Sequence, residues 1–507
     1  MTLGVAAELV QIRLNPRRIW RWHLWLVEYL TTSLRRSPKI VLSANGPVLA
    51  SSVATLLSLE RLVYRIQGQR ACDLLTLSDI PSSILVYDQD SPATLCSNIT
   101  VLDLSGENSP ATSTHWLMPA FDGAPAEDVL IGALLSGIVP KLTIIDASRR
   151  DLTWIAAPAV ENPRVLTRAL DNVFSTLFRL CRKALDEACL DRSEVSGNAG
   201  AQTPHRHEAR PSWPILRFAI SSISASATAR LTKLCARGPR WFVGWRWATE
   251  DRLHCTHELP PSGYMRLLDE PHRFYADPFG IRVQGRHYVF CEDFDYRLGR
   301  GVISMTVIDG NVPPRRPTVV LERPYHLSYP FVFAANEQIW MIPETAAAEG
   351  IELYRADPFP DRWVLEGVLL RNVRAADATL LRDKGRWWIF AATSEHQSSS
   401  WDALSLFHAP DLLGPWTPHR RNPVLIDRSM ARPGGALFTC RGALWRPAQN
   451  CSQGYGRGLT LCSVERLDEE DFVQSVKGII SPSPLWGPVG LHTINWVDGL
   501  ELVDGLG

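Results

Sequence analysis

The stretch RFYADPFG at residues 273–280 begins a pattern that returns four more times downstream, at intervals of about fifty residues. Each copy has an apolar run, a polar tight turn and an aromatic-rich run, which is typical of a β-hairpin. The later copies begin with SYPF at 328–331, ADAT at 376–379, RPGG at 432–435 and HTIN at 492–495. A repeat of this length built from short strands indicates one propeller blade per copy, so five copies predict a five-bladed β-propeller.

The segments that flank the repeat define the ends of the propeller. RWFVGWR at residues 240–246 has the composition of a strand, and the fifth copy is shorter than the others. If the first strand joins the last copy, both ends of the propeller close the ring in one blade, which protects the sheet edges. We therefore assign residues 240–507 to the propeller.

Polar side chains occupy matched positions of the copies. The start of the first strand and the end of the second emerge on the same face of an antiparallel pair, so Asp277 and Glu292 should meet at the mouth of the central channel. The same reasoning applies to the other blades. The resulting candidate set is Asp277, Glu292, Asp293, Tyr329, Glu344, Asp377, Thr393, Arg432, Gln449 and His492.

The composition is that of an ordinary globular protein. The chain has 507 residues, of which 45% are hydrophobic and 21% are charged, and this length indicates about two to four domains. Lys plus Arg and Asp plus Glu are equal at 53 each, so the formal net charge is zero. A neutral chain gives no support for nucleic acid as the main partner, and none is expected.

The ten cysteines are scattered, without a C-x-x-C pair and without a histidine at the sequence spacing of metal ligands. This pattern predicts buried, reduced thiols in a cytoplasmic protein. We expect no metal and no cofactor.

Residues 1–38 are expected to form an N-terminal helical segment. Arginines at 13, 17 and 18 precede the aromatic run IWRWHLWLVEYL at 19–30. The run lacks the features of a signal peptide and is too short and too charged to span a bilayer. Two alternatives remain: an ordinary packing helix, or a peripheral membrane contact through residues 13–30 that would make the cytoplasmic protein membrane-associated.

Residues 39–190 are expected to form a Rossmann-like α/β domain. Short apolar runs at 39–42, 83–87, 99–102 and 141–145 are typical of buried parallel strands, and helical stretches at 50–62, 128–136 and 163–190 lie between or after them. The turn at 43–47 has a single glycine, so it lacks a nucleotide-binding fingerprint. Residues 191–214 have the composition of a linker, and residues 215–239 are expected to form a connecting helix.

A resemblance to a known family rests on a set of segments along the repeat. These are WF at 241–242, ADPF at 276–279, ERPYHLSYPF at 322–331, PET at 343–345, DATL at 377–380, LGPW at 413–416, ARPGG at 431–435, RPAQ at 446–449 and HT at 492–493. With them, residues 240–504 resemble the propeller domain at the N-terminus of plant glucosamine inositolphosphorylceramide transferases and of bacterial proteins from surface-polysaccharide gene neighbourhoods.

The propeller is also similar, more distantly, to five-bladed glycoside hydrolases of the arabinanase and invertase type. In those enzymes an Asp-Pro near the start of the first blade supplies a catalytic carboxylate, which implies this role for Asp277. Bacterial relatives often carry an N-terminal domain that looks like a formyltransferase fold. This chain lacks the Asn-x-His-x-Ser-x-Leu-Pro motif, so the resemblance implies only a degenerate formyltransferase-like domain without that activity.

The resemblance and the carboxylates lead to two function hypotheses. In the first, the protein acts on a glycan or glycolipid in surface polysaccharide or glycoconjugate biosynthesis, by glycosyl transfer or hydrolysis. Asp277 would be the base or nucleophile, Glu344 the acid, and Asp377 would hold sugar hydroxyls or tune Glu344. The substrate-binding candidates are Glu292, Asp293, Tyr329, Arg432, Gln449 and His492, with Tyr329, Trp340 and Trp388 as either sugar-stacking or core aromatics.

The second hypothesis is a non-catalytic sugar-binding or scaffolding propeller that partners a glycosyltransferase. Carboxylates at strand ends also cap backbone groups and tie blades together, and Asp-Pro is a common turn dipeptide. The sequence leaves both hypotheses open, although it favours an enzyme of the glycosyltransferase or glycoside hydrolase type.

Overall fold

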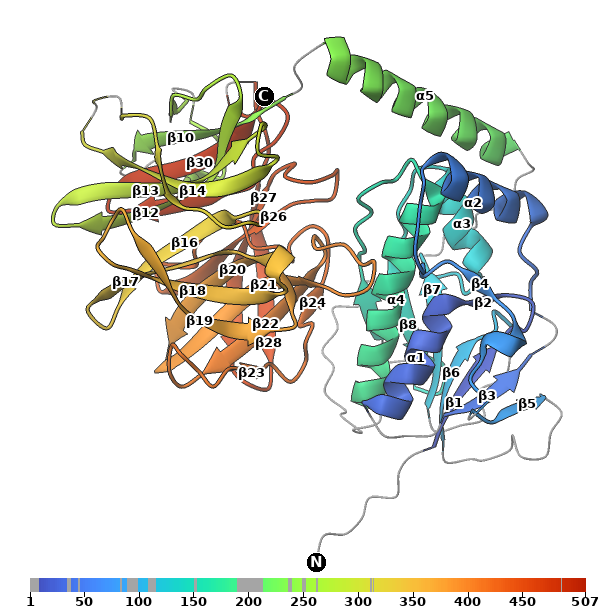
Figure 1. Cartoon of the computed structure of the whole chain (residues 1–507). Coiled ribbons are helices and arrows are strands. Elements are labelled where there is room, and N and C mark those ends of the chain that lie inside the picture. The colour runs from blue at the N-terminus through green and yellow to red at the C-terminus, as the bar shows by residue number, and fades with distance from the viewer. Residues whose placement is uncertain are drawn as a thin grey trace, which may run out of the picture. The chain divides into compact units, whose positions relative to one another are not determined.

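The computed structural model consists of two compact units, which are residues 1–234 with 396–399 and residues 235–395 with 400–507 (Figure 1). Each unit is described by itself. The residues whose structure is described are 9–33, 38–43, 46–82, 84–88, 99–107, 115–149, 153–188, 213–235, 239–248, 252–260, 263–310, 312, 314–484 and 486–507.

The first unit contains a seven-stranded sheet in the order β5-β3-β1-β6-β7-β8-β9. The strands from β5 to β7 in this order are parallel to their neighbours, and β8 and β9 are antiparallel. Their bounds are β1 Leu9–Leu14, β3 Lys39–Leu42, β5 Val86–Asp88, β6 Ile99–Leu104, β7 His115–Phe121, β8 Leu142–Asp146 and β9 Thr153–Ala156. The expected α/β class is confirmed.

The described part of this unit contains five α-helices, and α4 contacts three of them and the sheet. The helices are α1 Arg21–Thr32, α2 Ser51–Val63, α3 Glu127–Leu135, α4 Leu166–Ala188 and α5 Trp213–Cys235, with the short strands β2 Ile19–Trp20 and β4 Leu74–Leu75 beside them. Most side chains of α4 are buried, because it contacts α1, α2, α3 and several strands. The expected helices at 50–62, 128–136 and 163–190 correspond to α2, α3 and α4.

Two features of this unit differ from the sequence expectation. Residues 1–38 are not a separate helical segment, because they include β1, which pairs with β3 on one side and β6 on the other. The charged residue Arg13 makes this segment look unlike a buried strand in the sequence. Arg13 is nevertheless buried, because it forms an ion pair with Asp103 at 3.2 Å. The run at 141–145, expected to be parallel, forms the antiparallel strand β8.

The aromatic run at 19–30 forms β2 and most of α1, and its large side chains face the interior of the unit. Trp20 and Trp22 are 0% and 1% exposed, and both rings pack against Phe174 of α4. The structure therefore favours the packing helix over the peripheral membrane contact. None of the helices in the described part of the chain is both long and apolar enough to cross a bilayer.

Several expectations fall outside the described residues. These are most of the linker at 191–214 and part of the turn at 43–47. The connecting helix expected at 215–239 corresponds to α5.

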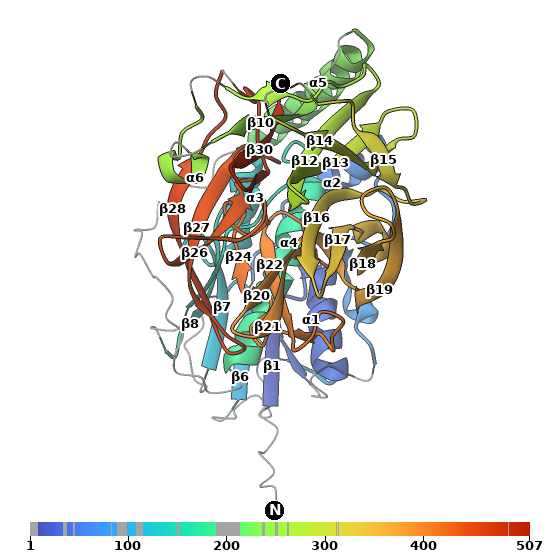
Figure 2. The same cartoon turned by 90° about the vertical axis from the view of Figure 1, so that its left-hand side faces the viewer.

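The second unit is the five-bladed propeller that the repeat predicts (Figure 2). The first blade consists of β12 Arg273–Val283, β13 Arg286–Asp295, β14 Arg300–Ile308 and β15 Thr318–Leu321; the second of β16 Ser328–Ala335, β17 Gln338–Glu344, β18 Gly350–Ala356 and β19 Trp363–Arg371; the third of β20 Arg374–Asp383, β21 Arg386–Ser394, β22 Ala403–Ala409, β23 Thr417–Pro418 and β24 Leu425–Ile426. The fourth consists of β25 Phe438–Cys440, β26 Ala443–Gln449, β27 Leu459–Leu467 and β28 Phe472–Ile480.

The fifth blade joins the two ends of the propeller. It consists of β11 Met265–Arg266, β10 Trp241–Trp247, β30 Leu500–Leu506 and β29 Ile494–Val497 in this spatial order, with the short helix α6 Leu253–Thr256 after β10. β10 and β30 are antiparallel and pair from Trp241 with Leu506 to Trp247 with Leu500. The expected ring closure by the first and last strands is confirmed.

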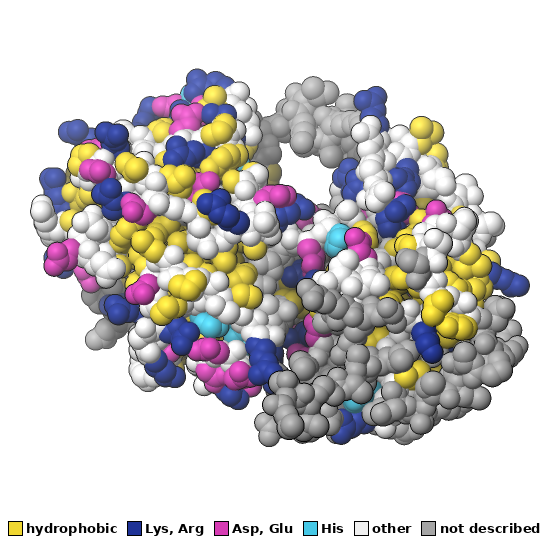
Figure 3. All heavy atoms as spheres, turned by 60° about the horizontal axis from the view of Figure 1, so that its bottom comes forward, with side chains coloured by type: hydrophobic (Ala, Val, Ile, Leu, Met, Phe, Trp, Pro, Cys, Tyr) yellow, Lys and Arg dark blue, Asp and Glu magenta, His cyan; other side chains and the backbone are white. Residues whose placement is uncertain are grey.

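Charged side chains of both signs are interspersed over the described surface that Figure 3 shows. This distribution agrees with the equal numbers of basic and acidic residues in the chain.

Candidate functional site

The inner strands of the first three blades begin with the same irregular backbone. Asp277, Tyr329 and Asp377 have φ angles of 51°, 45° and 54°, and each lies where the pairing register of its hairpin shifts. Such bulges re-aim side chains, and left-handed backbone at residues other than glycine is strained. The repeat thus turns three polar side chains inward at equivalent places.

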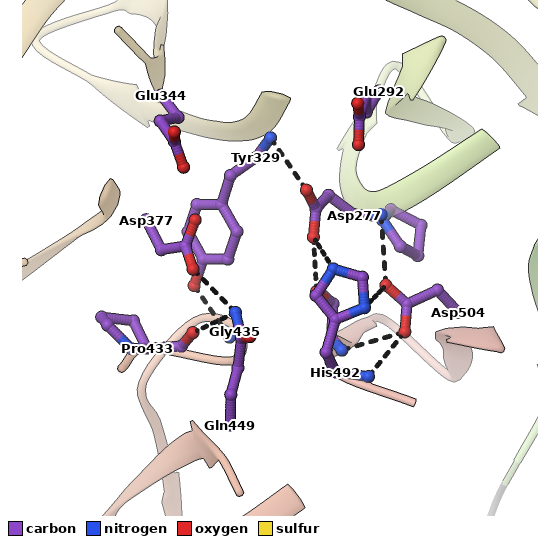
Figure 4. A network of polar contacts seen from close by, with 12 residues as sticks. Asp277, Glu292, Tyr329, Glu344, Asp377, Pro433, Gly435, Gln449, His492 and Asp504 are labelled. Atoms are coloured by element: carbon purple, nitrogen blue, oxygen red, sulfur yellow. Dashed lines mark hydrogen bonds and ion pairs between the residues drawn. The ribbon is translucent and has the colours of Figure 1, made fainter. Parts of the chain in front are cut away.

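Side chains from all five blades meet around these bulges (Figure 4). The first blade contributes Asp277 and Glu292, the second Tyr329 and Glu344, the third Asp377, the fourth Arg432 and Gln449, and the fifth His492 and Asp504. We call this group the mouth cluster. The structure thus brings together most of the polar residues that the repeat places at matched positions.

His492 lies between two buried carboxylates, and each ring nitrogen faces one of them. Nε2 is 3.0 Å from Asp277 Oδ1 and Nδ1 is 2.9 Å from Asp504 Oδ2. Burial disfavours the cation, but Asp504 and Asp277 together raise the pKa of His492 well above its ordinary value. An imidazolium has an N–H on both ring nitrogens, so His492 can pair with both carboxylates, and we call this trio the ion-pair relay.

Asp277 is held in its ionised form by this arrangement. Its carboxylate also accepts hydrogen bonds from the Thr493 hydroxyl at 2.7 Å and from the Tyr329 N–H at 3.2 Å. Burial opposes ionisation, but the His492 cation and these hydrogen bonds hold the pKa of Asp277 below its ordinary value. Asp277 is only 3% exposed and links the first blade to the second and the fifth.

A second buried ion pair joins the third and fourth blades. Arg432 Nε is 2.6 Å from Asp377 Oδ2, and Arg432 Nη2 is 3.2 Å from Asp377 Oδ1. Gln449 Nε2 donates to the same carboxylate at 2.7 Å and to the Pro433 carbonyl at 2.9 Å. The Gln449 Oε1 atom is buried and has no hydrogen-bond partner among the described residues, so it remains available as an acceptor.

Tyr329 is part of the framework and not a surface for stacking. Its side chain is fully buried. Its hydroxyl pairs with the Thr379 hydroxyl at 2.9 Å and accepts a hydrogen bond from the Gly435 N–H at 2.8 Å. These contacts join the second blade to the third and fourth.

Glu344 is the most accessible acid of the mouth cluster, with a side chain that is 16% exposed. Its Oε2 lies 3.5 Å from Arg432 Nη2. Burial and the neighbouring carboxylate of Asp377 raise the pKa of Glu344 to about 8, although Arg432 opposes the shift. The side chain therefore carries a proton at neutral pH, as a general acid must.

Glu292 is a second acid whose pKa is raised. Burial and the charge of Asp277 raise the pKa of Glu292 well above its ordinary value. His326 Nε2 lies 3.5 Å from Glu292 Oε1, and His326 Nδ1 accepts the Gly301 N–H at 2.8 Å. His326 is a neighbour that the sequence did not single out.

Two predicted residues have their contacts elsewhere. Asp293 follows Glu292 in β13, so its side chain points to the other face of the sheet, where it binds Arg273 at 2.6 Å and Ser304 at 2.7 Å. Thr393 pairs with the Ser405 hydroxyl at 2.7 Å within the third blade. The structure does not bring either residue into the mouth cluster.

The aromatic residues at the mouth differ from those expected. Trp340 and Trp388 are 6% and 3% exposed and belong to the hydrophobic core between blades. Instead, Trp241, Trp401 and Tyr455 are half-buried beside the cluster. The ring centroids of Trp241 and His492 are 4.0 Å apart, and those of Tyr455 and Trp401 are 5.6 Å apart.

We call Trp241, Trp401 and Tyr455 the aromatic rim. Arg432 lies over the Tyr455 ring at 5.1 Å and donates to the Ser400 hydroxyl at 3.0 Å. Trp401 and Tyr455 lie outside the repeated hairpins, so the repeat did not reveal them. The mouth thus combines a carboxyl group with a lowered pKa (Asp277), two with a raised pKa (Glu292 and Glu344), the Arg432 guanidinium and aromatic faces.

The N-terminal domain of a known family matches the propeller. The family described as "Glucosamine inositolphosphorylceramide transferase 1, N-terminal" matches residues 265–481. Glucosamine inositolphosphorylceramide transferase 1 of Oryza sativa subsp. japonica is 37% identical over 207 residues, which are 40% of this chain and 28% of that protein. The protein of the same name from Arabidopsis thaliana is 33% identical over 209 residues, 40% of this chain and 27% of that protein.

Solved structures with a partial likeness are glycoside hydrolases. Zg3597, a family 117 glycoside hydrolase of Zobellia galactanivorans, is 12% identical with a TM-score of 0.36, and the likeness covers 53% of this chain and 90% of that chain. The α-L-arabinanase of Cellvibrio cellulosa is 15% identical with a TM-score of 0.31, covering 41% and 78%. Nothing about activity follows from likenesses at these scores.

The sequence matches cover little more than a quarter of the two plant relatives. Residues 265–481 of this chain are thus similar to the N-terminal domain of glucosamine inositolphosphorylceramide transferase 1.

Proposed function

We propose that the mouth of the propeller binds a sugar residue of a glycan or glycolipid and that glycosyl transfer or hydrolysis takes place there. The observation that carries this proposal is the different surroundings of two carboxyl groups in the mouth cluster. Asp277 lies 3.0 Å from His492, which lowers the pKa of Asp277, whereas burial and Asp377 raise the pKa of Glu344 to about 8. Breaking a glycosidic bond with paired carboxyl groups requires this combination of one carboxylate and one acid.

Each group has a defined step in the proposed reaction. Glu344 gives its proton to the leaving oxygen as the glycosidic bond breaks, and the Asp377 carboxylate beside it favours the protonated form beforehand. Asp277 either removes the proton of the attacking hydroxyl or water, or attacks the anomeric carbon itself. The positive charge of His492 keeps Asp277 ionised while the sugar develops positive charge.

Groups around the acids supply the binding of the sugar. Trp241 and Tyr455 of the aromatic rim offer half-buried ring faces, and Arg432 offers hydrogen-bond donors between them and Glu344. Gln449 Oε1 is a buried acceptor without a partner among the described residues. A ring face together with convergent donors and acceptors suits a polar ligand with one apolar side, such as a pyranose.

The substrate class follows from the plant relatives. Their name, glucosamine inositolphosphorylceramide transferase 1, refers to an amino sugar and a glycolipid. We therefore propose a glycolipid or lipid-linked glycan of surface polysaccharide or glycoconjugate biosynthesis as substrate, with a separate glycosyltransferase as partner.

A second candidate function is sugar binding or scaffolding without turnover. Asp277 and Asp377 are only 3% and 1% exposed, and both oxygens of each carboxylate are engaged by groups of the chain. Such carboxylates also serve as clamps between blades. The named relatives are, in addition, much longer than the matched segment.

One experiment separates the two candidates. The full chain and the variants Asp277→Asn and Glu344→Gln are incubated with a panel of lipid-linked and free oligosaccharides, and products are detected by mass spectrometry. The control is Glu322→Gln, which changes an exposed glutamate paired with Arg300 on the surface. Catalysis at the mouth predicts that both mouth variants lose turnover by at least about 100-fold while the control retains it.

The non-catalytic alternative predicts a different set of results. The wild type would show no turnover across the panel, and glycan affinity, measured by calorimetry, would fall on changing Trp241→Ala or Tyr455→Ala. Turnover that survives unchanged in both Asp277→Asn and Glu344→Gln would contradict the assigned roles.

A further inference from the structure

A histidine and two cysteines that are far apart in the sequence meet at another place in the propeller. His254 and Cys255 lie in α6, and Cys440 ends β25. One potential ligand atom of each residue lies within 4.8 Å of those of the other two. This cluster could not be recognised from local spacing, because about 185 residues separate its two parts.

The cluster is separate from the mouth cluster. Cys440 lies five residues beyond Gly435, whose N–H binds Tyr329 at the mouth, and five residues of extended chain span about 16 Å. Likewise, β10 begins at Trp241 beside His492 and runs to Trp247 before α6 follows. The cluster therefore belongs to the opposite ends of these strands.

The His254 side chain is buried, and its Nδ1 atom has no hydrogen-bond partner among the described residues. The residue is 7% exposed. Aromatic rings fix the imidazole, since Trp496 meets it edge-on at 4.5 Å and Phe438 packs against it at 4.8 Å. A buried polar nitrogen that lacks a partner is costly unless a ligand satisfies it.

The chemistry of the three side chains suits a metal ion. His254 offers an imidazole nitrogen, and Cys255 and Cys440 are both free thiols that solvent reaches. The neutral imidazole of histidine and the thiolate of cysteine are both metal ligands. One nitrogen and two sulfurs form a ligand set that zinc prefers.

The positions of the backbone are compatible with coordination. Leu253, next to His254, donates its N–H to the buried Glu501 carboxylate at 2.8 Å, which fixes the start of α6. Cys440 is fixed by its pairing with Ala443 across a tight turn. Zinc bond lengths place tetrahedral ligand atoms about 3.5 to 3.8 Å apart. Side-chain rotations that shift each ligand atom by under about 1 Å therefore bring the three atoms to coordination distance.

We propose that His254, Cys255 and Cys440 form a zinc-binding site that links α6 of the fifth blade to β25 of the fourth. Two thiolates and a neutral imidazole balance the charge of Zn²⁺, and the exposed side of Cys255 leaves the fourth position to water. The ion ties the blade that closes the ring to its neighbour, so the propeller is more stable with zinc bound.

The test measures zinc binding by the full chain. The protein is reduced, stripped with a chelator, desalted and titrated with Zn²⁺ against a chromophoric chelator, and Co²⁺ substitution reports thiolate ligation through its charge-transfer absorption. We expect about one Zn²⁺ per chain and a higher Tm with the metal. His254→Gln and Cys440→Ser should each weaken binding by at least about 10-fold and remove the thiolate signal or reduce it.

A matched control is His257→Asn, which removes a histidine from the same turn. His257 has a left-handed φ of 59°, which asparagine tolerates, and it is not part of the cluster. The proposal is overturned if the reduced chain binds no Zn²⁺, or if His254→Gln and Cys440→Ser bind it as the wild type does. It is equally overturned if Cys255 and Cys440 form a disulfide, seen as a loss of two hydrogens in the intact mass, and the reduced chain binds no metal.

Discussion

His492 holds the mouth cluster together through charge. It is 2% exposed and is the one cation within hydrogen-bond distance of both Asp277 and Asp504 among the described residues. The variant His492→Gln would leave at least one buried carboxylate without a counter-charge. Losing one partner of a buried ion pair costs about 3 to 5 kcal/mol.

We therefore expect His492→Gln to lower the free energy of unfolding by about that amount, as measured by urea unfolding. His326→Gln is the control, because the His326 side chain is 38% exposed and lies 3.5 Å from its acidic neighbour. Equal effects of the two variants would show that the His492 ion pairs contribute little.

Glu344 should make the stability of the propeller depend on pH. Its pKa is raised from 4.5 to about 8 in the folded state, so the folded protein binds more protons than the unfolded chain between these values. Stability therefore falls as the pH rises through this window, by up to about 5 kcal/mol. Glu344→Gln removes this loss, because an amide does not ionise.

The measurement is urea unfolding of wild type and Glu344→Gln from about pH 5 to about pH 9. We expect the variant to gain stability relative to the wild type as the pH rises, with most of the gain below about pH 8. A difference between the two proteins that stays constant with pH would contradict the raised pKa.

At the scale of elements, close packing between blades explains one glycine of the fourth blade, Gly435, whereas Gly442 lies in an open turn. Gly435 has a φ of +139°, and a Cβ there would lie 2.0 Å from the Ile494 carbonyl of the neighbouring β29. The motif RPGG therefore marks where two inner strands approach each other closely. Gly442, in the turn between β25 and β26, has a φ of +77° and open space around it.

These two glycines provide a matched pair of substitutions. Gly442→Ala should cost about 1 kcal/mol from left-handed backbone alone. Gly435→Ala adds a clash with backbone that must move, so we expect at least about 3 kcal/mol in chemical unfolding. Equal costs would mean that β25 and β29 separate easily.

The repeat explains which parts of the site were predictable. Asp277 and Asp377 occupy one matched position of the hairpins, at the start of the first strand, and Glu344 occupies the other, at the end of the second strand. Their convergence follows from the period and from the antiparallel pairing. Asp504 and Thr493 complete the ion-pair relay, but Asp504 lies in the last strand, where the truncated copy has no counterpart. The aromatic rim and the proposed zinc site of His254, Cys255 and Cys440 are formed by insertions and strand ends. These segments do not recur at the repeat interval, so the repeat does not predict that they meet.

In the first unit, strand β1 also depends on a contact between residues far apart in the sequence, so its local pattern did not predict it. LVQIRL at residues 9–14 has buried polar side chains, and Arg13 is compatible with the interior only because Asp103 lies beside it on β6. An ion pair between residues 90 positions apart leaves no local trace in the sequence. The apolar runs of β3 and β6, in contrast, were recognisable.

At the scale of the whole molecule, the propeller contains all the pairing that closes its ring. β10 and β30 pair over their full lengths, and both lie between residues 239 and 507. A polypeptide of residues 239–507 should therefore fold by itself, with a β-rich circular dichroism spectrum and a cooperative thermal transition.

The closure strand provides the decisive comparison for this last prediction. Removing residues 498–507 deletes β30, so β10 and β29 lose their partner, and the fifth blade has no continuous sheet. The buried residues Asp504 and Glu501 are lost as well. His492 then keeps only one of its two carboxylates, and Arg246 and the start of α6 lose their contacts with Glu501. We expect this shorter polypeptide to show no cooperative transition, whereas residues 239–507 do. If residues 239–507 and the polypeptide without residues 498–507 melt cooperatively at the same temperature, β30 does not stabilise the ring. Contacts other than those of β30 must then hold the fourth and first blades together.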